Sequence, residues 1–270
     1  MVTDGHNHTR HFSPDADQSI GELCAAAAKL GINRLAVTEH YDADFPDGSL
    51  KWEFDFDEYA TAFSQWRKDN PEIELLMGVE FGYQTHLAGK IDEWAQSAPF
   101  DTVLLSNHLF RGEDIYTTRL LYELPSKECF KEYVGILAEM TERCNNFDVV
   151  AHYDYINRYG SGESTPLRYD DCPDEFDRFF EVLIAKEKAL EINTKSVQKL
   201  AEKNPSNFMP DSKILRRYID MGGKLITLGS DAHIPSGVGV YFNETAEYLK
   251  SLGITETVYY KGHKPYPEAL

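Results

Sequence analysis

Short apolar runs of strand length alternate with stretches of helical periodicity along most of the chain. Residues 19–30 carry apolar side chains at helical spacing and end at Gly31, and the apolar run 34–38 follows and leads into Glu39-His40. The same alternation predicts further helices at 56–68, 91–96, 127–143, 175–186, 212–221 and 243–252, and further strands at 74–79, 102–106, 147–151, 189–192 and 225–228. With a first strand before His6, the pattern predicts about seven strand-then-helix units.

Three stretches lack a clear period. Residues 112–125 and 153–172 are predicted to be long loops over one face of the molecule, and loops of that length are often functional. The end of the chain, with Pro265 and Pro267, is predicted to be irregular.

Strands that alternate with helices in one domain imply parallel pairing, and about seven of them favour a closed barrel over an open doubly wound sheet. No linker or low-complexity boundary interrupts the chain, so we expect residues 1–270 to form a single α/β domain of the TIM-like barrel type. In barrels of parallel strands the chemistry lies at the carboxyl-terminal rim. Residues that directly follow the predicted strands are therefore the candidates for a functional site.

Polar residues able to bind metal or substrate stand at the ends of the predicted strands. His6 and His8 open the series; in an extended backbone their side chains project to the same side and can hold one ion together. The other candidates are His40, Glu80, His108, His152, Asn193, Asp231 and His233. The remaining histidines, His11, His86 and His263, are expected at the surface.

Composition narrows the possible partners. The chain has 270 residues, 42% of them hydrophobic, and its 27 Lys and Arg against 45 Asp and Glu give a net charge of −18. This argues against a nucleic-acid surface, but a small phosphorylated substrate fits because bound cations can invert the local field. The sequence has no apolar run long enough for a membrane span and no signal-peptide pattern, and its four cysteines lack Cys-x-x-Cys spacing. We therefore expect a cytoplasmic protein with reduced thiols, and the sequence leaves its oligomeric state open.

Six histidines with Glu80 and Asp231 are too many ligands for one tetrahedral zinc site. They predict a cluster of two or three divalent cations, with Glu80 as the bridging carboxylate and Asp231 as a terminal one. Nitrogen and oxygen ligands without cysteine favour zinc, iron or manganese. Such a cluster suits hydrolysis of a phosphate ester by a metal-bridging hydroxide.

The ordered motifs resemble those of the PHP (polymerase and histidinol phosphatase) family over residues 4 to about 240. They are His6-Asn7-His8, Glu39-His40, Gly78-Val79-Glu80, Ser106-Asn107-His108, Ala151-His152 and Gly229-Ser230-Asp231-Ala232-His233. The opening Asp-Gly-His-x-His-Thr and the Thr-Glu-His at the second strand are most similar to the histidinol-phosphatase branch. The resemblance implies a distorted seven-stranded (β/α) barrel with three metal ions, which hydrolyses L-histidinol phosphate to L-histidinol and phosphate in histidine biosynthesis.

The resemblance also implies how the ligands are shared among three ions. It assigns His6, His8, Glu80 and Asp231 to the first ion, Glu80, His108 and His152 to the second, and His40 and His233 to the third. The third ion needs one more ligand from the segment after His8, where several relatives have a histidine after Cys-Pro. This chain has Phe12-Ser13-Pro14-Asp15 instead, so Asp15 is expected there, with Asp17 and His11 as alternatives.

Substrate contacts are less specified by the sequence. Arg158 is the first candidate for binding the phosphate and Arg111 the second, although either could be a solvated loop charge. Asn193 could bind a substrate amine or cap the segment that follows it. Asp231 or His233 could transfer a proton to the leaving group. Tyr116, Tyr153 and Tyr155 lie in the predicted rim loops and could equally be packing residues.

Other functions remain possible at this level. The same ligands would serve a phosphoesterase acting on phosphotyrosine, a nucleotide or a sugar phosphate. A polymerase-associated module is disfavoured by the short, acidic chain, and a non-catalytic metal-stabilised scaffold is weakly disfavoured by two long rim loops that carry arginines.

Overall fold

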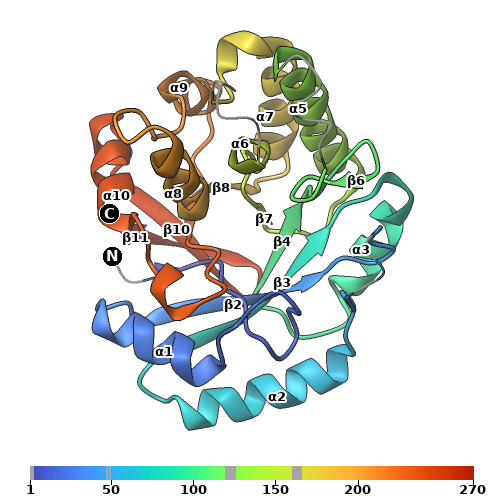
Figure 1. Ribbon diagram of the computed structural model, residues 1–270, viewed down its shortest axis with the longest axis vertical. Coiled ribbons are helices and arrows are strands. Elements are labelled where there is room, and N and C mark those ends of the chain that lie inside the picture. Colours follow the sequence, from blue (N-terminus) through green and yellow to red (C-terminus); the bar gives the residue numbers. More distant parts are fainter. Residues whose placement is uncertain (1–2, 47, 49, 119–125, 160–165) are drawn as a thin grey trace.

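Seven parallel strands form one curved sheet in the computed structural model, which describes residues 3–46, 48, 50–118, 126–159 and 166–270 (Figure 1). The strands follow one another in the order β1-β2-β3-β4-β7-β8-β9, and each pair of neighbours is parallel. They are β1 (Thr3–Asp4), β2 (Arg34–Tyr41), β3 (Glu74–Gly82), β4 (Thr102–Ser106), β7 (Val149–Val150), β8 (Ala189–Asn193) and β9 (Ile226–Gly229). The predicted parallel sheet is confirmed.

The sheet closes between the first and the last strand. The amide of Gly5 donates to the carbonyl of Leu228 at 2.9 Å, and the amide of Asp231 donates to the carbonyl of His6 at 2.8 Å. A Cβ on Gly5 would lie 2.7 Å from the Leu228 carbonyl oxygen, so glycine permits this close approach. The result is the predicted α/β barrel of seven strands, in which the two ends of the chain meet.

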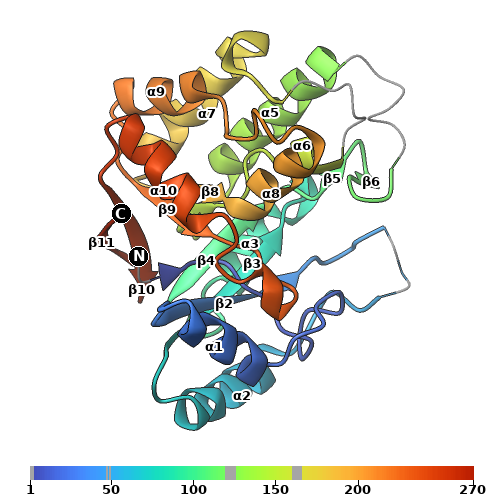
Figure 2. The same cartoon turned by 60° about the vertical axis from the view of Figure 1, so that its left-hand side comes forward.

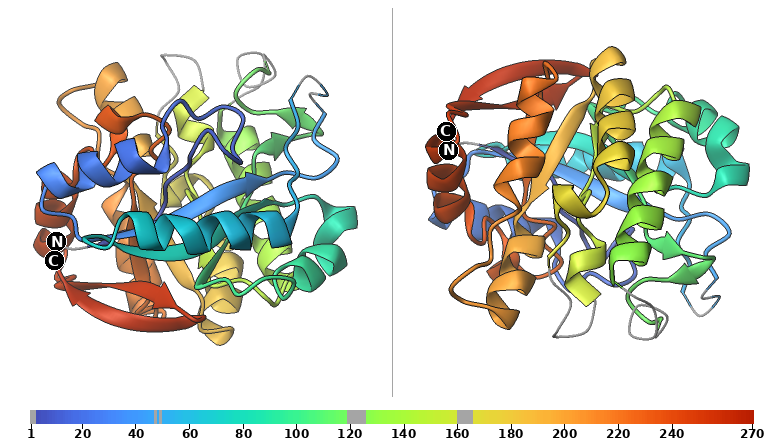
Figure 3. Two further views of the ribbon diagram at one scale, coloured as in Figure 1. Left: turned by 90° about the horizontal axis from the view of Figure 1, so that it is seen from below. Right: turned by 90° about the horizontal axis from the view of Figure 1, so that it is seen from above.

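Helices surround the sheet (Figures 2 and 3). They are α1 (Ile20–Lys29), α2 (Phe56–Asp69), α3 (Ala88–Trp94), α5 (Ser126–Arg143), α6 (Ile156–Tyr159), α7 (Pro173–Ala185), α8 (Thr194–Lys203), α9 (Ser212–Asp220) and α10 (Phe242–Ser251). The first begins at a capping box, in which Ser19 and Glu22 each bond to the other's backbone amide. Its buried face, with Leu23 and Ala27, belongs to the same apolar core as Val37 of β2 and Val79 of β3.

The prediction of an irregular chain end is wrong, and one helix was not predicted. Residues 256–269 form an antiparallel hairpin of β10 (Glu256–Lys261) and β11 (Lys264–Ala269). Proline is tolerated in β11 because this strand pairs only with β10 and lies at an edge. Residues 194–203, for which no element was predicted, form α8, and the side chain of Asn193 caps this helix by accepting from the amide of Lys195.

The two predicted rim loops also contain regular structure. β5 (Leu109–Phe110) and β6 (Glu113–Asp114) form a small hairpin in the first, and α6 occupies part of the second. The remainder of these predictions, at 119–125 and 160–165, falls outside the described residues.

The β10–β11 hairpin lies at the amino-terminal ends of the barrel strands. The amide of His263 donates to the carbonyl of Asp101, just before β4, at 3.0 Å, and the amide of Thr3 in β1 donates to Glu268 at 3.1 Å. Buried Tyr260 packs in an apolar cluster with Leu104, Val149 and Ala189 of the barrel. The chain end therefore covers the bottom of the barrel, which leaves the carboxyl-terminal rim for chemistry.

All four cysteines are buried and free, as the absence of a disulfide pattern predicted. Among the described residues, no helix has both the length and the apolar character needed to cross a bilayer.

Candidate metal centre

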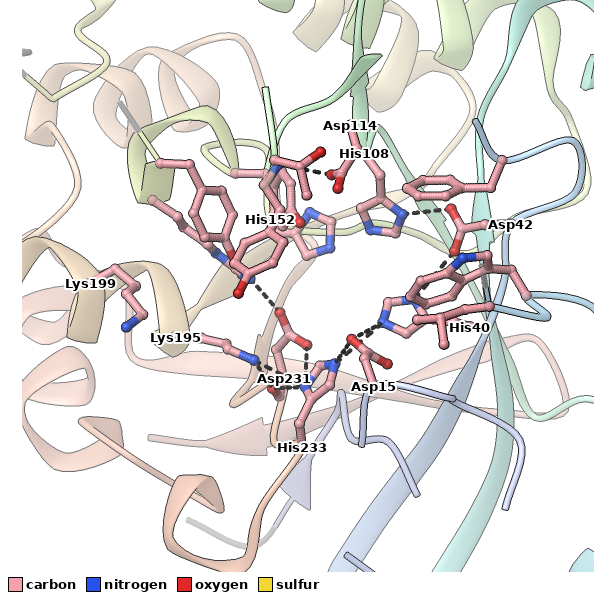
Figure 4. Close-up of a pocket in the computed structure, with 18 residues that line it drawn as sticks. Asp15, His40, Asp42, His108, Asp114, His152, Lys195, Lys199, Asp231 and His233 are labelled. Carbon is pink, nitrogen blue, oxygen red and sulfur yellow. Dashed lines mark hydrogen bonds and ion pairs between the residues drawn. The ribbon is translucent and has the colours of Figure 1, made fainter. Parts of the chain in front are cut away.

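Six histidines and two carboxylates converge at the carboxyl-terminal ends of the strands. Figure 4 shows those that also line the cavity: His40, His108, His152, Asp231 and His233. His40 and Glu80 lie within β2 and β3, and the others lie directly after a strand: His6 and His8 after β1, His108 after β4, His152 after β7, and Asp231 and His233 after β9. All are buried except His233, which is partly exposed. The structure therefore brings together the side chains that the sequence placed at the ends of strands.

Glu80 occupies the centre of this group and is fully buried. Its Oε2 lies 2.9 Å from His40 Nδ1, 3.3 Å from His6 Nε2 and 3.5 Å from His8 Nε2, and its Oε1 lies 2.6 Å from His152 Nε2 and 3.2 Å from His108 Nε2. One carboxylate facing five imidazoles is the arrangement expected of a bridging ligand.

Four overlapping sets of side chains bring their ligand atoms within 4.8 Å of one another. They are His6, His8 and Glu80; His40, Glu80 and His108; His6, His152 and Asp231; and His8, His40 and His233. Most members belong to more than one set, so the geometry suits several ions held side by side.

Several ligand atoms are buried without a hydrogen-bond partner among the residues that the structure describes. These are His6 Nε2, His8 Nε2, His40 Nδ1 and Glu80 Oε2, all of them in the centre of the group. Buried polar atoms are normally satisfied because leaving them unpaired is costly. Imidazole nitrogens and carboxylate oxygens suit zinc, manganese and iron, so the residues present fit a cluster of divalent cations.

The candidates for the remaining ligand differ in position. Asp15 Oδ2 lies 3.0 Å from His233 Nε2 and 3.8 Å from His40 Nε2. His11 instead packs on the Trp66 ring, and Asp17 is exposed and does not line the cavity. Burial alone would raise the pKa of Asp15, but the neighbouring histidines hold it well below its usual value. Asp15 is thus the ionised group that reaches His40 and His233.

A second layer of side chains orients the histidines. His6 Nδ1 lies 2.8 Å from Glu191 Oε1, and His108 Nδ1 lies 2.7 Å from Asp42 Oδ1. If each Nδ1 carries the proton, each Nε2 is left free toward the centre, as in metal-bound histidines. Gly229 leaves room for the first pair, because a Cβ there would collide with Glu191 and His6.

The loop that carries Asp15 is fixed by Glu39. This buried carboxylate accepts from the Thr9 amide at 3.0 Å and from Ser13 Oγ at 2.6 Å, and Ser13 Oγ also accepts from the His40 amide at 3.0 Å. Burial raises the pKa of Glu39 to about 7. Sequence reasoning assigned no role to Glu39, Asp42 or Glu191; the available signal was a carboxylate within or beside an apolar run of strand length.

Two ligands occupy unusual backbone positions. His152 and Asp231 have φ values of 26° and 51°, in the left-handed region that side chains other than glycine rarely adopt. The amide of His152 donates to Glu191 at 2.6 Å, and that of Asp231 donates to the His6 carbonyl at 2.8 Å. Such conformations cluster at functional sites, where the surrounding structure maintains them.

Cationic side chains form one wall of the centre. Arg158 of α6 is buried and donates to Asp231 Oδ2 at 2.6 Å, to Asn193 Oδ1 at 2.8 Å and to Ser196 Oγ at 2.9 Å. Lys195 of α8 places its Nζ 3.0 Å from His233 Nδ1. The sequence suggested Arg158, but Lys195 was missed together with its helix.

Arg111 and Asn193 do not line the cavity beside the centre. Arg111, which was predicted to bind substrate, lies in the turn of the β5–β6 hairpin and bonds to the partly exposed Glu132 on α5 at 2.7 Å. Asn193 fulfils its alternative prediction as a cap; its amide group donates to Glu191 and its oxygen accepts from Arg158 and Lys195. Both side chains are held by the protein itself, and their contact with substrate stays a prediction.

A cavity of about 470 Å³ opens above the ligands. Its walls include His40, His108, His152, Asp231, Arg158, Lys195, Asp114, Trp52, Tyr116, Tyr155 and Tyr159. Tyr155 packs on His152 and His108, with ring centroids 4.9 Å and 5.3 Å apart. Of the tyrosines singled out from the sequence, Tyr116 and Tyr155 line the cavity, whereas Tyr153 is buried in the core.

Comparison with known proteins identifies the family. The model of the PHP domain matches residues 4–195. The chain belongs to the PHP family. The resemblance read from the strand-end motifs is confirmed.

Its relatives within the PHP family match over almost their whole length. The "Probable histidinol-phosphatase" of Clostridium acetobutylicum is 30% identical over 264 residues, which cover 97% of this chain and 98% of the relative. The histidinol-phosphatase of Lactococcus lactis is 27% identical and covers 97% of this chain and 95% of its own. A crystal structure of the Lactococcus lactis histidinol phosphate phosphatase with zinc, L-histidinol and phosphate has a TM-score of 0.87 at 26% identity, with 98% of each chain covered.

Proposed function

We propose that this PHP protein is a metal-dependent phosphatase that hydrolyses L-histidinol phosphate to L-histidinol and phosphate. The observation that carries the proposal is the group of six histidines around Glu80 and Asp231 at the base of a cavity that also holds Arg158. Central atoms of this group are buried and have no hydrogen-bond partner in the described ranges of the chain. Full-length similarity to a structure that contains zinc, L-histidinol and phosphate supports the choice of substrate. The free, buried cysteines fit a cytoplasmic enzyme, and we place the reaction in histidine biosynthesis.

The ligand set supports three divalent ions, which we propose to be zinc, manganese or iron. His6, His8, Glu80 and Asp231 would hold the first, Glu80, His108 and His152 the second, and His40, His233 and Asp15 the third. When bound, such ions polarise the phosphoryl oxygens, lower the pKa of water and stabilise the leaving oxygen.

The chain's own residues would orient the phosphoryl group and move protons. Arg158 and Lys195 lie on one side of the cavity and offset the negative charge of the phosphoryl oxygens. Burial alone would raise the pKa of Asp231, but Lys195, Arg158 and His6 hold it well below its usual value. Asp231 or His233 beside it would pass the proton released by the attacking water to the leaving oxygen.

A substrate panel tests this proposal. Phosphate release from L-histidinol phosphate, phosphotyrosine and AMP should be measured after loading with zinc or manganese, with metal counted per chain. We expect the highest kcat/KM for L-histidinol phosphate. A preference for phosphotyrosine or AMP would overturn the substrate assignment.

A further inference from the structure

The carboxylates that line the cavity differ in what they contact. Asp15 faces His233, Asp42 faces His108 at 2.7 Å, and Asp231 bonds to Arg158 at 2.6 Å. Each of these three carboxylates contacts a histidine of the candidate metal centre or the arginine beside it. The fourth, Asp114, contacts neither.

Asp114 keeps one oxygen unengaged. Its Oδ1 accepts from the amide of Tyr116 at 2.8 Å and so closes a local turn. Its Oδ2 has no hydrogen-bond or ion-pair partner within the described part of the chain. Among the cavity carboxylates, this is the one that can take a cation from outside the protein.

The β5–β6 hairpin fixes Asp114 close to the ligands. Asp114 pairs with Leu109, and the following amide, that of Ile115, donates to the carbonyl of His108 at 3.0 Å. Figure 4 shows Asp114 beside His108 and across the opening from His233.

Charge is therefore separated across the cavity. Arg158 and Lys195 are cationic and adjoin Asp231 and His233, whereas Asp114 is anionic and adjoins His108. A substrate with a phosphate at one end and an ammonium group at the other matches this separation. Nucleotides and sugar phosphates lack the ammonium group and gain nothing from Asp114.

We propose that Asp114 binds the ammonium group of the substrate and selects phosphate monoesters of amino alcohols. The Tyr116, Tyr159 and Tyr155 rings continue from this residue toward the metal centre, with neighbouring centroids 5.1 Å and 5.2 Å apart, and supply aromatic faces for the rest of the cation. This inference rests on the proposed phosphatase function and names the feature that determines its specificity.

The test is Asp114→Asn, because asparagine keeps the oxygen that accepts from the Tyr116 amide but removes the charge. We expect kcat/KM for L-histidinol phosphate to fall about 10- to 100-fold, mainly through KM, as for loss of a charge-assisted hydrogen bond. Hydrolysis of p-nitrophenyl phosphate, whose leaving group carries no cation, should change less than about twofold. Metal content per chain should be unchanged.

Glu113→Gln is the matched control, since Glu113 neighbours Asp114 on β6 but is exposed and does not line the cavity. It should leave both substrates unaffected. An Asp114→Asn protein with unchanged KM for L-histidinol phosphate, or with equal losses on both substrates, would overturn the role of Asp114 while leaving the phosphatase function intact. A wild-type protein that hydrolyses p-nitrophenyl phosphate but not L-histidinol phosphate would overturn the proposed function and this inference together.

Discussion

At the carboxyl end of the barrel, buried ligand atoms face one another and have no hydrogen-bond partner among the described residues, whereas at the amino end charged side chains pair across the strand termini. At the carboxyl end, the unpaired atoms include those of His6, His8 and Glu80. The amino end joins Arg34 to Glu74 and to Glu268 of the C-terminal hairpin. Central polar atoms at the carboxyl end are thus unpaired within the described part of the chain, whereas the charged side chains Arg34, Glu74 and Glu268 at the amino end pair with one another. Substitutions at the two ends should therefore separate catalysis from stability.

The largest effect is expected from removing the central charge of the carboxyl end. Glu80→Gln takes away the carboxylate that faces five histidines. We expect a loss of phosphatase activity of about 1000-fold or more, equivalent to about 4 kcal/mol, together with a fall in metal content. His8→Ala should likewise lose metal and activity. A Glu80→Gln protein with full metal content and full turnover, by elemental analysis and phosphate release, would contradict the site model.

The opposite result is expected at the amino end. Tyr260→Ala removes a buried ring from the cluster with Leu104, Val149 and Ala189, and should lower the free energy of unfolding by about 3 kcal/mol. Because this ring lies away from the ligands, kcat should stay within about twofold of wild type at a temperature where the variant is folded. Denaturant unfolding and steady-state kinetics check both values. Tyr260→Phe is the control and should be nearly neutral, because the buried hydroxyl has no hydrogen-bond partner among the described residues.

A smaller effect is expected from the layer behind the ligands. Glu191→Gln keeps an acceptor for the His152 amide but removes the charge that orients His6. We expect metal affinity to fall about 10- to 100-fold, as for other orienting carboxylates, while the fold is retained. Competition with a chelator measures the affinity, and circular dichroism checks the fold. An unchanged affinity would show that Glu191 has only a packing role.

The smallest effect is expected in the pH dependence of stability, from a histidine at the amino end of the barrel. The hydrogen bond from His263 to Asp148 raises the pKa of the imidazole above its usual value, and the imidazole is about half exposed. A raised pKa in the folded state means that this stabilisation is complete below the unfolded value, about pH 6.5, and is lost as the pH rises through the folded value.

His263→Asn tests this pH-dependent stabilisation, because asparagine tolerates the residue's φ of 60° but does not titrate. The substitution should lower the free energy of unfolding at pH 6 by less than about 1 kcal/mol. At pH 9 the loss should be smaller than at pH 6. Thermal unfolding at the two pH values measures the difference. An equal loss at both would exclude the ionic contribution.

The convergence of the candidate metal ligands could be predicted because their positions follow from strand order. Each is carried by or directly follows an apolar run, and parallel strands bring their carboxyl ends to one rim. His6 and Asp231 are far apart in sequence but adjacent in the barrel, since β1 and β9 close it. This information is contained in the alternation of apolar and polar residues.

Features that depend on tertiary packing were not predictable in this way. Helix α8 has few apolar residues, so its helical pattern was missed, and with it the place of Lys195 in the cavity. Pro265 and Pro267 suggested irregular structure, but a two-stranded hairpin accepts them at its edge. The sequence ranked Arg158 before Arg111 as a loop arginine, and the fold adds that Arg111 pairs with Glu132 whereas Arg158 lies beside Asp231.

Metal titration of the stripped protein tests the central claim most directly. Protein freed of metal with a chelator should be titrated with zinc or manganese while bound metal per chain and phosphate release from L-histidinol phosphate are followed together. We predict no turnover without metal, and activity that rises with the number of bound ions up to three per chain. Full turnover by the metal-free protein, or no phosphate release at full occupancy, would contradict it.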